Sequence, residues 1–116
     1  HNRHAEATRR AVNAWGLEIQ CQEPTEYSPV LTGVVMPDGY DADALREVIL
    51  DKYNMSLGSG LGRVKGKVFR IGHLGDFNDL MLLGTLSGVE MGLAVAGIPH
   101  KKGGAQAAID FLIGNT

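Results

Sequence analysis

Arg70 lies in a short apolar stretch, Val68 to Ile71, that is typical of a β-strand. Alternate side chains of a strand point to opposite faces, so Phe69 and Ile71 share one face. Arg70 points to the other face, together with Val68. A guanidinium on a strand offers a rigid fork of N–H donors that matches a carboxylate in bidentate fashion. Arg70 is therefore a candidate for binding an organic acid, although a charged strand residue is more often simply exposed to water.

A glycine-rich segment, Gly58 to Gly66, precedes this strand. It does not match a P-loop, because Leu61 stands where a glycine is required and Val68 stands where Ser or Thr is required. A dinucleotide fingerprint is also excluded, since its third glycine position is Arg63 and a strand rather than a helix follows. Two interpretations remain open: a plain hairpin connection, or a loop that closes over a ligand. The candidate residues of such a loop are Gly60, Leu61 and Gly62.

Size and composition favour one small globular domain. The chain has 116 residues, of which 44% are hydrophobic and only 6% aromatic, so we expect a mostly aliphatic core. A net charge of −2 gives no electrostatic reason to expect a nucleic-acid partner. The single cysteine, Cys21, cannot form an internal disulfide, and we interpret it as a packing residue. Because no apolar signal segment is present either, we expect a cytoplasmic protein.

The predicted elements follow the order α-β-β-α-β-β-α-α. Helices are predicted at residues 2–14, 42–53, 77–96 and 104–113, and strands at residues 17–20, 30–36, 55–57 and 68–71. Asp41 is the expected N-cap of the second helix and Asp76 that of the third, with Asp79 in a capping-box position. Pairs of strands between helices favour an α+β fold, in which a small, mainly antiparallel sheet has helices packed on one face. The other face is then open, or is covered by something outside this chain.

The segment Leu80 to Ile98 has the length and apolar character of a membrane span, and its glycines recur at four-residue spacing. Glu90 lies near its middle, where a charge would cost on the order of 2–3 kcal/mol at a bilayer centre. We therefore interpret it as a buried helix whose glycines let a neighbour come close, and we expect no membrane association. The four histidines lack zinc-site spacing, and we interpret them as solvated or locally bonded, with no metal site.

Several blocks of sequence resemble the C-terminal domain of class V aminotransferases, which are fold-type I enzymes that use pyridoxal phosphate. The most specific part is Leu57 to Gly62 followed by Gly66 to Gly75, with Arg-Ile-Gly at its centre. The runs Val35 to Asp41 and Asp76 to Met91 strengthen the resemblance, which extends over essentially the whole chain. Bacterial serine–glyoxylate aminotransferases are the most similar branch of that family.

The resemblance implies that Arg70 binds the carboxylate of the amino-acid or 2-oxo-acid substrate. It further implies that residues 1–116 are one domain, the C-terminal small domain of a homodimeric enzyme, which packs against a large domain. Such an enzyme transfers an amino group from serine to glyoxylate and yields hydroxypyruvate and glycine. In that family the Schiff-base lysine and the rest of the cofactor site belong to the large domain, and their motifs are absent here. We therefore expect no catalytic residue, no bound cofactor and no turnover in this chain alone.

Two other hypotheses remain. The chain could be a free-standing α+β module that binds a small acid through Arg70 and the glycine-rich loop, or a plain oligomerisation domain. A sequence that begins without Met inside a predicted helix is a hint that it belongs to something longer. An upstream coding region with a pyridoxal-binding lysine supports the enzyme, whereas a natural start codon at this point supports the module.

Overall fold

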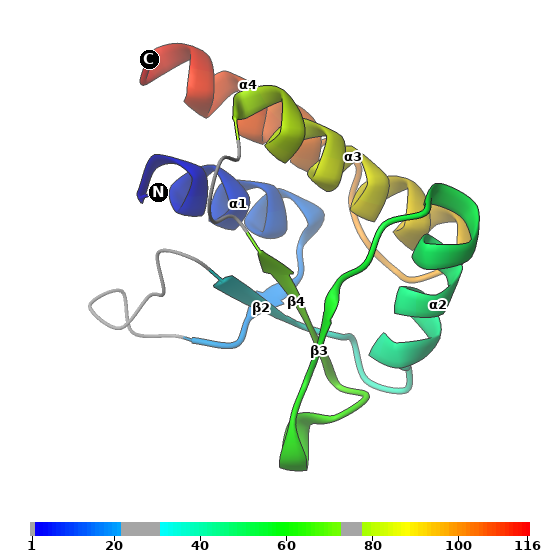
Figure 1. The fold of residues 1–116 in the computed structure, drawn as a ribbon. Coiled ribbons are helices and arrows are strands. Elements are labelled where there is room, and N and C mark those ends of the chain that lie inside the picture. The colour runs from blue at the N-terminus through cyan, green and yellow to red at the C-terminus, as the bar shows by residue number, and fades with distance from the viewer. Residues whose placement is uncertain (1, 22–30, 73–77) are drawn as a thin grey trace.

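The computed structural model describes residues 2–21, 31–72 and 78–116. Within these ranges the chain forms four α-helices, four strands and one short 3-10 helix, an α+β fold as predicted (Figure 1). In chain order they are α1 (Asn2–Trp15), β1 (Glu18–Ile19), β2 (Leu31–Val35), α2 (Ala42–Tyr53), β3 (Gly58–Ser59), η2 (Gly62–Val64), β4 (Val68–Gly72), α3 (Asp79–Val95) and α4 (Gly104–Gly114).

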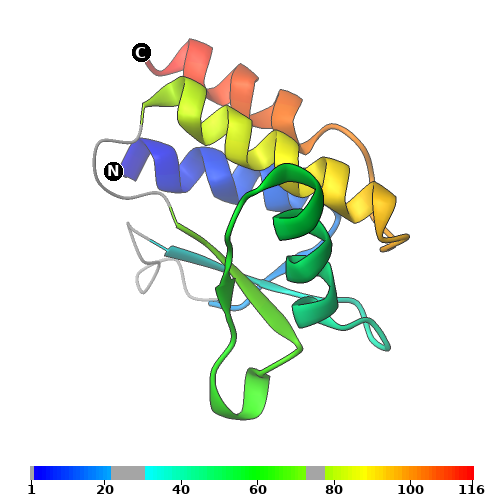
Figure 2. The same ribbon diagram turned by 45° about the vertical axis from the view of Figure 1, so that its right-hand side comes forward.

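The four strands form one antiparallel sheet in the order β1-β2-β4-β3. In the register of its two central strands, Val34 pairs with Phe69 and Gly33 pairs with Arg70. Val34, Phe69 and Ile71 share one face and are completely buried. Figures 1 and 2 show the helices on a single side of the sheet, and the buried face lies against them. The prediction of helices packed on one face is therefore confirmed.

The ends of the first two helices follow the local sequence. At the end of α1, Gly16 has a φ of +78°, and the Leu17 N–H reaches back to the Val12 carbonyl at 3.2 Å. This is the left-handed helix ending that glycine permits. Asp41 caps α2 as expected, because its carboxylate accepts the Asp43 N–H at 2.9 Å.

The start of α3 differs from the prediction. The N-cap is Asn78, whose side chain accepts the Met81 N–H at 2.8 Å, so the prediction of a cap at Asp76 was wrong. Asp76 itself lies outside the described residues. Asp79 is the first helical residue rather than the third, so it is not part of a capping box. Asn and Asp are equally good caps, and sequence alone could not rank these nearby candidates.

The third predicted strand is also displaced. Residues 55–57 form no strand, and β3 begins inside the glycine-rich segment, where Gly58 pairs with Arg70 and Ser59 with Phe69. Glycine has low strand propensity, but pairing with β4 determines the local conformation here. The glycine-rich connection between the two strands is correspondingly shorter than predicted.

The apolar helix α3 packs on α2, and on Met55 just after it, through two of its glycines. A Cβ atom on Gly92 would lie 2.3 Å from Ile49 Cγ1, and one on Gly88 would lie 2.9 Å from Met55 Cε. Gly84 instead faces open space. Two of the three glycines therefore allow the close approach that the sequence predicted. Within the described ranges, no helix combines the length and the apolar character needed to cross a bilayer.

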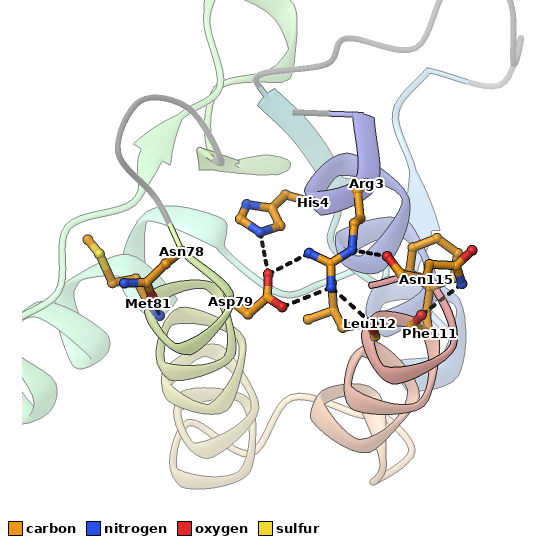
Figure 3. Close-up of polar contacts among 8 residues, drawn as sticks. All are labelled: Arg3, His4, Asn78, Asp79, Met81, Phe111, Leu112 and Asn115. Atoms are coloured by element: carbon orange, nitrogen blue, oxygen red, sulfur yellow. Dashed lines mark hydrogen bonds and ion pairs between the residues drawn. The ribbon is translucent and has the colours of Figure 1, made fainter.

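A polar cluster connects the start of α1 to α3 and α4 (Figure 3). Arg3 binds the Asp79 carboxylate through both terminal nitrogens, at 2.6 and 2.8 Å, and donates to the carbonyls of Leu112 and Asn115. His4 Nε2 lies 2.8 Å from the same carboxylate. Hydrogen bonds from Arg3 and His4 hold the pKa of Asp79 well below its usual value.

The sequence predicted that His4 is solvated or bonded to a nearby residue, but its contact in this cluster is with a residue far away in the sequence. Its partner, Asp79, lies 75 positions away rather than nearby. His100 does make the expected local contact, between Nδ1 and the Ile98 carbonyl oxygen at 2.7 Å. The other two histidines, His1 and His73, lie outside the described residues.

Candidate functional site

Arg70 lies on β4, an interior strand, and points to the sheet face opposite the helices. Its side chain is half-buried, whereas Phe69 and Ile71 on the other face are completely buried. Among the residues that the structure describes, none forms a hydrogen bond or ion pair with the Arg70 guanidinium. The fork of donors is therefore available for a group from outside the described chain.

Both cross-strand neighbours of Arg70 are glycines. Gly33 on β2 and Gly58 on β3 pair directly with it. A Cβ atom on Gly58 would lie 3.1 Å from Arg70 Cβ and 3.7 Å from both Cγ and Cδ, so the stem of the arginine occupies the space that glycine leaves. The position of a Cβ on Gly33 is occupied in turn by the Gln20 side chain, whose Oε1 lies 2.5 Å away. The two residues that pair directly with Arg70 therefore place no side chain of their own beside it.

The candidate loop residues Gly60, Leu61 and Gly62 lie beside this hairpin. Gly60 is buried, and its N–H donates to the Val68 carbonyl at 3.1 Å. A Cβ on Gly60 would lie 2.4 Å from the Val64 carbonyl oxygen, so only glycine fits there. Gly62 begins η2 with a φ of +58°, a conformation that glycine adopts readily. Leu61 is 65% exposed.

The loop and Arg70 are joined through β4 rather than by a direct contact. Val68, which accepts the Gly60 hydrogen bond, lies two residues before Arg70 on the same strand and points to the same face. The two interpretations of the loop from sequence therefore both remain compatible with the structure. The loop connects β3 to β4 as a hairpin connection, and it carries the exposed Leu61.

Metal ligands are not gathered in this region. In the portions of the chain that the structure describes, no group of three His, Cys, Asp or Glu side chains is arranged to hold an ion. The Arg70 guanidinium on this face suits an anion and not a cation.

Comparison with known proteins was made by family model, by sequence and by structure. No family model matches the chain. It is 45% identical over 116 residues to the serine–glyoxylate aminotransferase of Methylorubrum extorquens, which covers 97% of this chain and 29% of that protein. It is 43% identical over 108 residues to the L-aspartate–glyoxylate aminotransferase of Paracoccus denitrificans, which covers 93% of this chain and 27% of that protein.

The same relationship is found among solved structures. The ureidoglycine–glyoxylate aminotransferase of Bacillus subtilis superimposes with a TM-score of 0.88 at 30% identity, over 97% of this chain and 30% of that one. The chain belongs to the class V aminotransferase family. It spans under a third of the length of these aminotransferase relatives, so it corresponds to one segment of such an enzyme. The fold that the resemblance implied is confirmed by this superposition.

In this aminotransferase segment, Arg70 is a candidate that the sequence predicted, whereas its surroundings were not predicted. The row Gln20, Gly33, Arg70 and Gly58 runs across the sheet from the residue that follows β1 to β3, and its members are far apart in the sequence. Only the strand register brings them together, and register is determined by long-range pairing. The one local signal was Gly33 within a predicted strand, since glycine in a strand often marks a close approach.

Proposed function

We propose that this chain is the C-terminal small domain of a longer, homodimeric transaminase that depends on pyridoxal phosphate, and that Arg70 binds the carboxylate of its substrates. One observation carries the proposal. Arg70 lies on an interior strand, on the sheet face opposite the helices, between Gly33 and Gly58. Neither glycine brings a side chain of its own between the guanidinium and a planar carboxylate.

Substrate identity is proposed from the relatives. The three aminotransferases compared above all carry glyoxylate in their names, but their partners are serine, L-aspartate and ureidoglycine. We infer glyoxylate as the amino acceptor and serine as the donor, giving glycine and hydroxypyruvate. Serine, glyoxylate and both products carry a carboxylate next to the reacting carbon. A single arginine can therefore orient every acid of the cycle.

The residues of this chain do not fit a pyridoxal phosphate site. All five lysines are exposed, and a lysine that forms a Schiff base is activated by desolvation or by a neighbouring cation. These lysines are Lys52, Lys65, Lys67, Lys101 and Lys102. In the whole enzyme the cofactor supplies an electron sink for amino-group transfer, and the part of the enzyme outside this chain holds it. No catalytic step is therefore assigned to this chain.

The role left to this chain is to bind and orient the acid. Arg70 fixes the carboxylate plane by two parallel N–H···O bonds, so the α-carbon is held at a constant distance from the sheet. Orientation of this kind contributes to catalysis because it removes rotational freedom before the reaction. The large domain then covers the open sheet face and completes the site.

The test uses the full-length enzyme that contains this chain. Arg70→Ala should raise the KM for both serine and glyoxylate by roughly 10- to 100-fold, since a charge-assisted hydrogen-bond pair is lost. Arg70→Lys should recover only part of this loss, because lysine has no planar fork. Arg10→Ala, on the helical side of the domain, is the matched control and should leave both KM values unchanged. A normal KM in Arg70→Ala would refute the proposal.

A further inference from the structure

The Gln20 side chain lies over Gly33, beside Arg70. Its backbone N–H donates to the Gly33 carbonyl at 2.9 Å, so Gln20 continues the pairing of β1 with β2 beyond Ile19. Because side chains alternate along a strand, Gln20 points to the face opposite the buried Ile19, which is the face of Arg70. Gln20 itself is exposed, and so it can contact a ligand on that face.

Gln20 does not simply stand out into solvent. Its Oε1 lies 2.5 Å, and its Cβ 3.1 Å, from the place that a Gly33 Cβ would occupy. The carboxamide has therefore crossed from its own strand to the neighbouring one. Gly33 is the direct partner of Arg70, and adjacent strands lie about 4.8 Å apart. The amide group thus ends about one strand spacing from the Arg70 backbone, on the same side of the sheet, and the Arg70 stem lies over Gly58 on the other side of that backbone. A carboxylate bound to the guanidinium would lie between the two groups.

This arrangement suits a carboxylate bound to Arg70. A bidentate arginine uses one lone pair on each carboxylate oxygen and leaves a second lone pair on each. A carboxamide N–H can donate to one of these remaining lone pairs. The amide is neutral, so it adds a donor without competing for the arginine, whereas a carboxylate at the same place would pair with Arg70 itself.

We propose that Gln20 is a second substrate-binding residue, whose amide donates to the carboxylate that Arg70 holds. Gly33 has a positioning role, because any side chain there would displace the Gln20 carboxamide. The inference rests on the proposed function, since it requires the acid to bind at Arg70. It adds a polar contact from the residue that follows β1, the edge strand opposite β3.

The experiment measures KM and kcat of Gln20 variants of the full-length enzyme with serine and glyoxylate. Gln20→Leu keeps the approximate size but has no donor, and should raise both KM values by about 3- to 10-fold with kcat within about twofold. Gln20→Glu should raise them further, because its charge repels the substrate and pairs with Arg70. Gln106→Ala, an exposed glutamine on α4, is the control and should change neither value.

A second variant separates substrate binding from a purely structural role. Gly33→Ala should displace the carboxamide and raise KM as Gln20→Leu does. The double variant should be no worse than either single one, because both remove the same contact. Additive effects, or a loss of thermal stability with unchanged KM, would show that Gln20 only covers the sheet and would overturn the inference.

The two proposals fail in different ways. If Arg70→Ala raises KM and Gln20→Leu does not, Gln20 is not a substrate ligand and the proposed function stands. If Arg70→Ala leaves KM unchanged, the acid does not bind at this face and both proposals are wrong.

Discussion

Trp15, the last residue of α1, donates its indole N–H to the carboxylate of Glu90 on α3 at 2.9 Å. The same carboxylate accepts the backbone N–H groups of Gly103 and Ala105, each at 3.1 Å, at the start of α4. Gly103 is the N-cap of that helix and has no side chain to cap it. Glu90 therefore supplies the cap from another helix and complements the positive end of the α4 dipole.

Removal of the Glu90 carboxylate should destabilise the domain. Glu90→Leu leaves the Trp15 indole and two helix N–H groups without their acceptor, and we expect a loss of about 2–3 kcal/mol in the free energy of unfolding. Urea denaturation of the variant and of the parent chain measures it. Glu47→Leu, at an exposed position on α2, should stay within about 0.5 kcal/mol of the parent. Equal effects of the two substitutions would contradict the capping role.

The same contact makes part of the stability depend on pH. Burial of Glu90 by itself raises its pKa, but hydrogen bonds from Trp15 and the α4 backbone outweigh burial and leave the pKa below the usual 4.5. A carboxyl group whose folded-state pKa is lowered adds stability above its unfolded-state pKa and loses it as pH falls through the folded-state value. The difference in unfolding free energy between the parent and Glu90→Gln should thus be constant from pH 6 to 8. It should shrink below about pH 4.5, where an unchanged difference would be inconsistent with this ionisation.

Local features of the fold were readable from the sequence because they depend on neighbouring residues. The alternation around Arg70 identified its face, and Asp41 and Gly16 marked helix ends by the conformations they favour. The order of the predicted elements favoured the α+β architecture, and the family resemblance agreed with it. These features require only the period of the pattern and the chemistry of caps.

Features that depend on tertiary pairing were not readable. Glu90 suggested only that the apolar helix does not cross a membrane, and nothing nearby indicated that it caps α4. Arg3 and Asp79 are 76 positions apart, and their contact exists because α1 and α3 pack in the same layer. The partners of Arg70 needed the strand register, which one sequence does not encode locally.

The two faces of α3 offer a matched pair of glycine substitutions. Gly92→Ala places a methyl group where Ile49 Cγ1 lies only 2.3 Å away, so we expect a loss of about 1–3 kcal/mol in unfolding free energy. Gly84→Ala meets nothing within 4 Å and should gain up to about 1 kcal/mol from higher helix propensity. In thermal denaturation, the melting temperature should therefore fall for Gly92→Ala and should not fall for Gly84→Ala. A destabilising Gly84→Ala would mean that this face of α3 is not open.

The cap of α3 gives a test of the corrected helix start. Asn78→Ala removes the acceptor of the Met81 N–H and should cost about 1 kcal/mol of unfolding free energy. Asn78→Asp should cost little, because aspartate accepts the same hydrogen bond and its charge suits a helix N-terminus. Chemical denaturation compares the two variants. Similar losses in both would show that the side chain of residue 78 does not cap the helix.

Gly58 should matter for substrate binding rather than for stability. Its missing side chain leaves room for the Arg70 stem, so Gly58→Val should push the guanidinium from its place and raise the KM of the full-length enzyme for both acids several-fold. Valine has a higher strand propensity than glycine, so the denaturation midpoint should not fall. Ser59→Val is the matched control, because Ser59 pairs with Phe69 and points to the opposite face. Normal KM values in the Gly58→Val enzyme would show that Arg70 does not need the space at this glycine to bind its ligand.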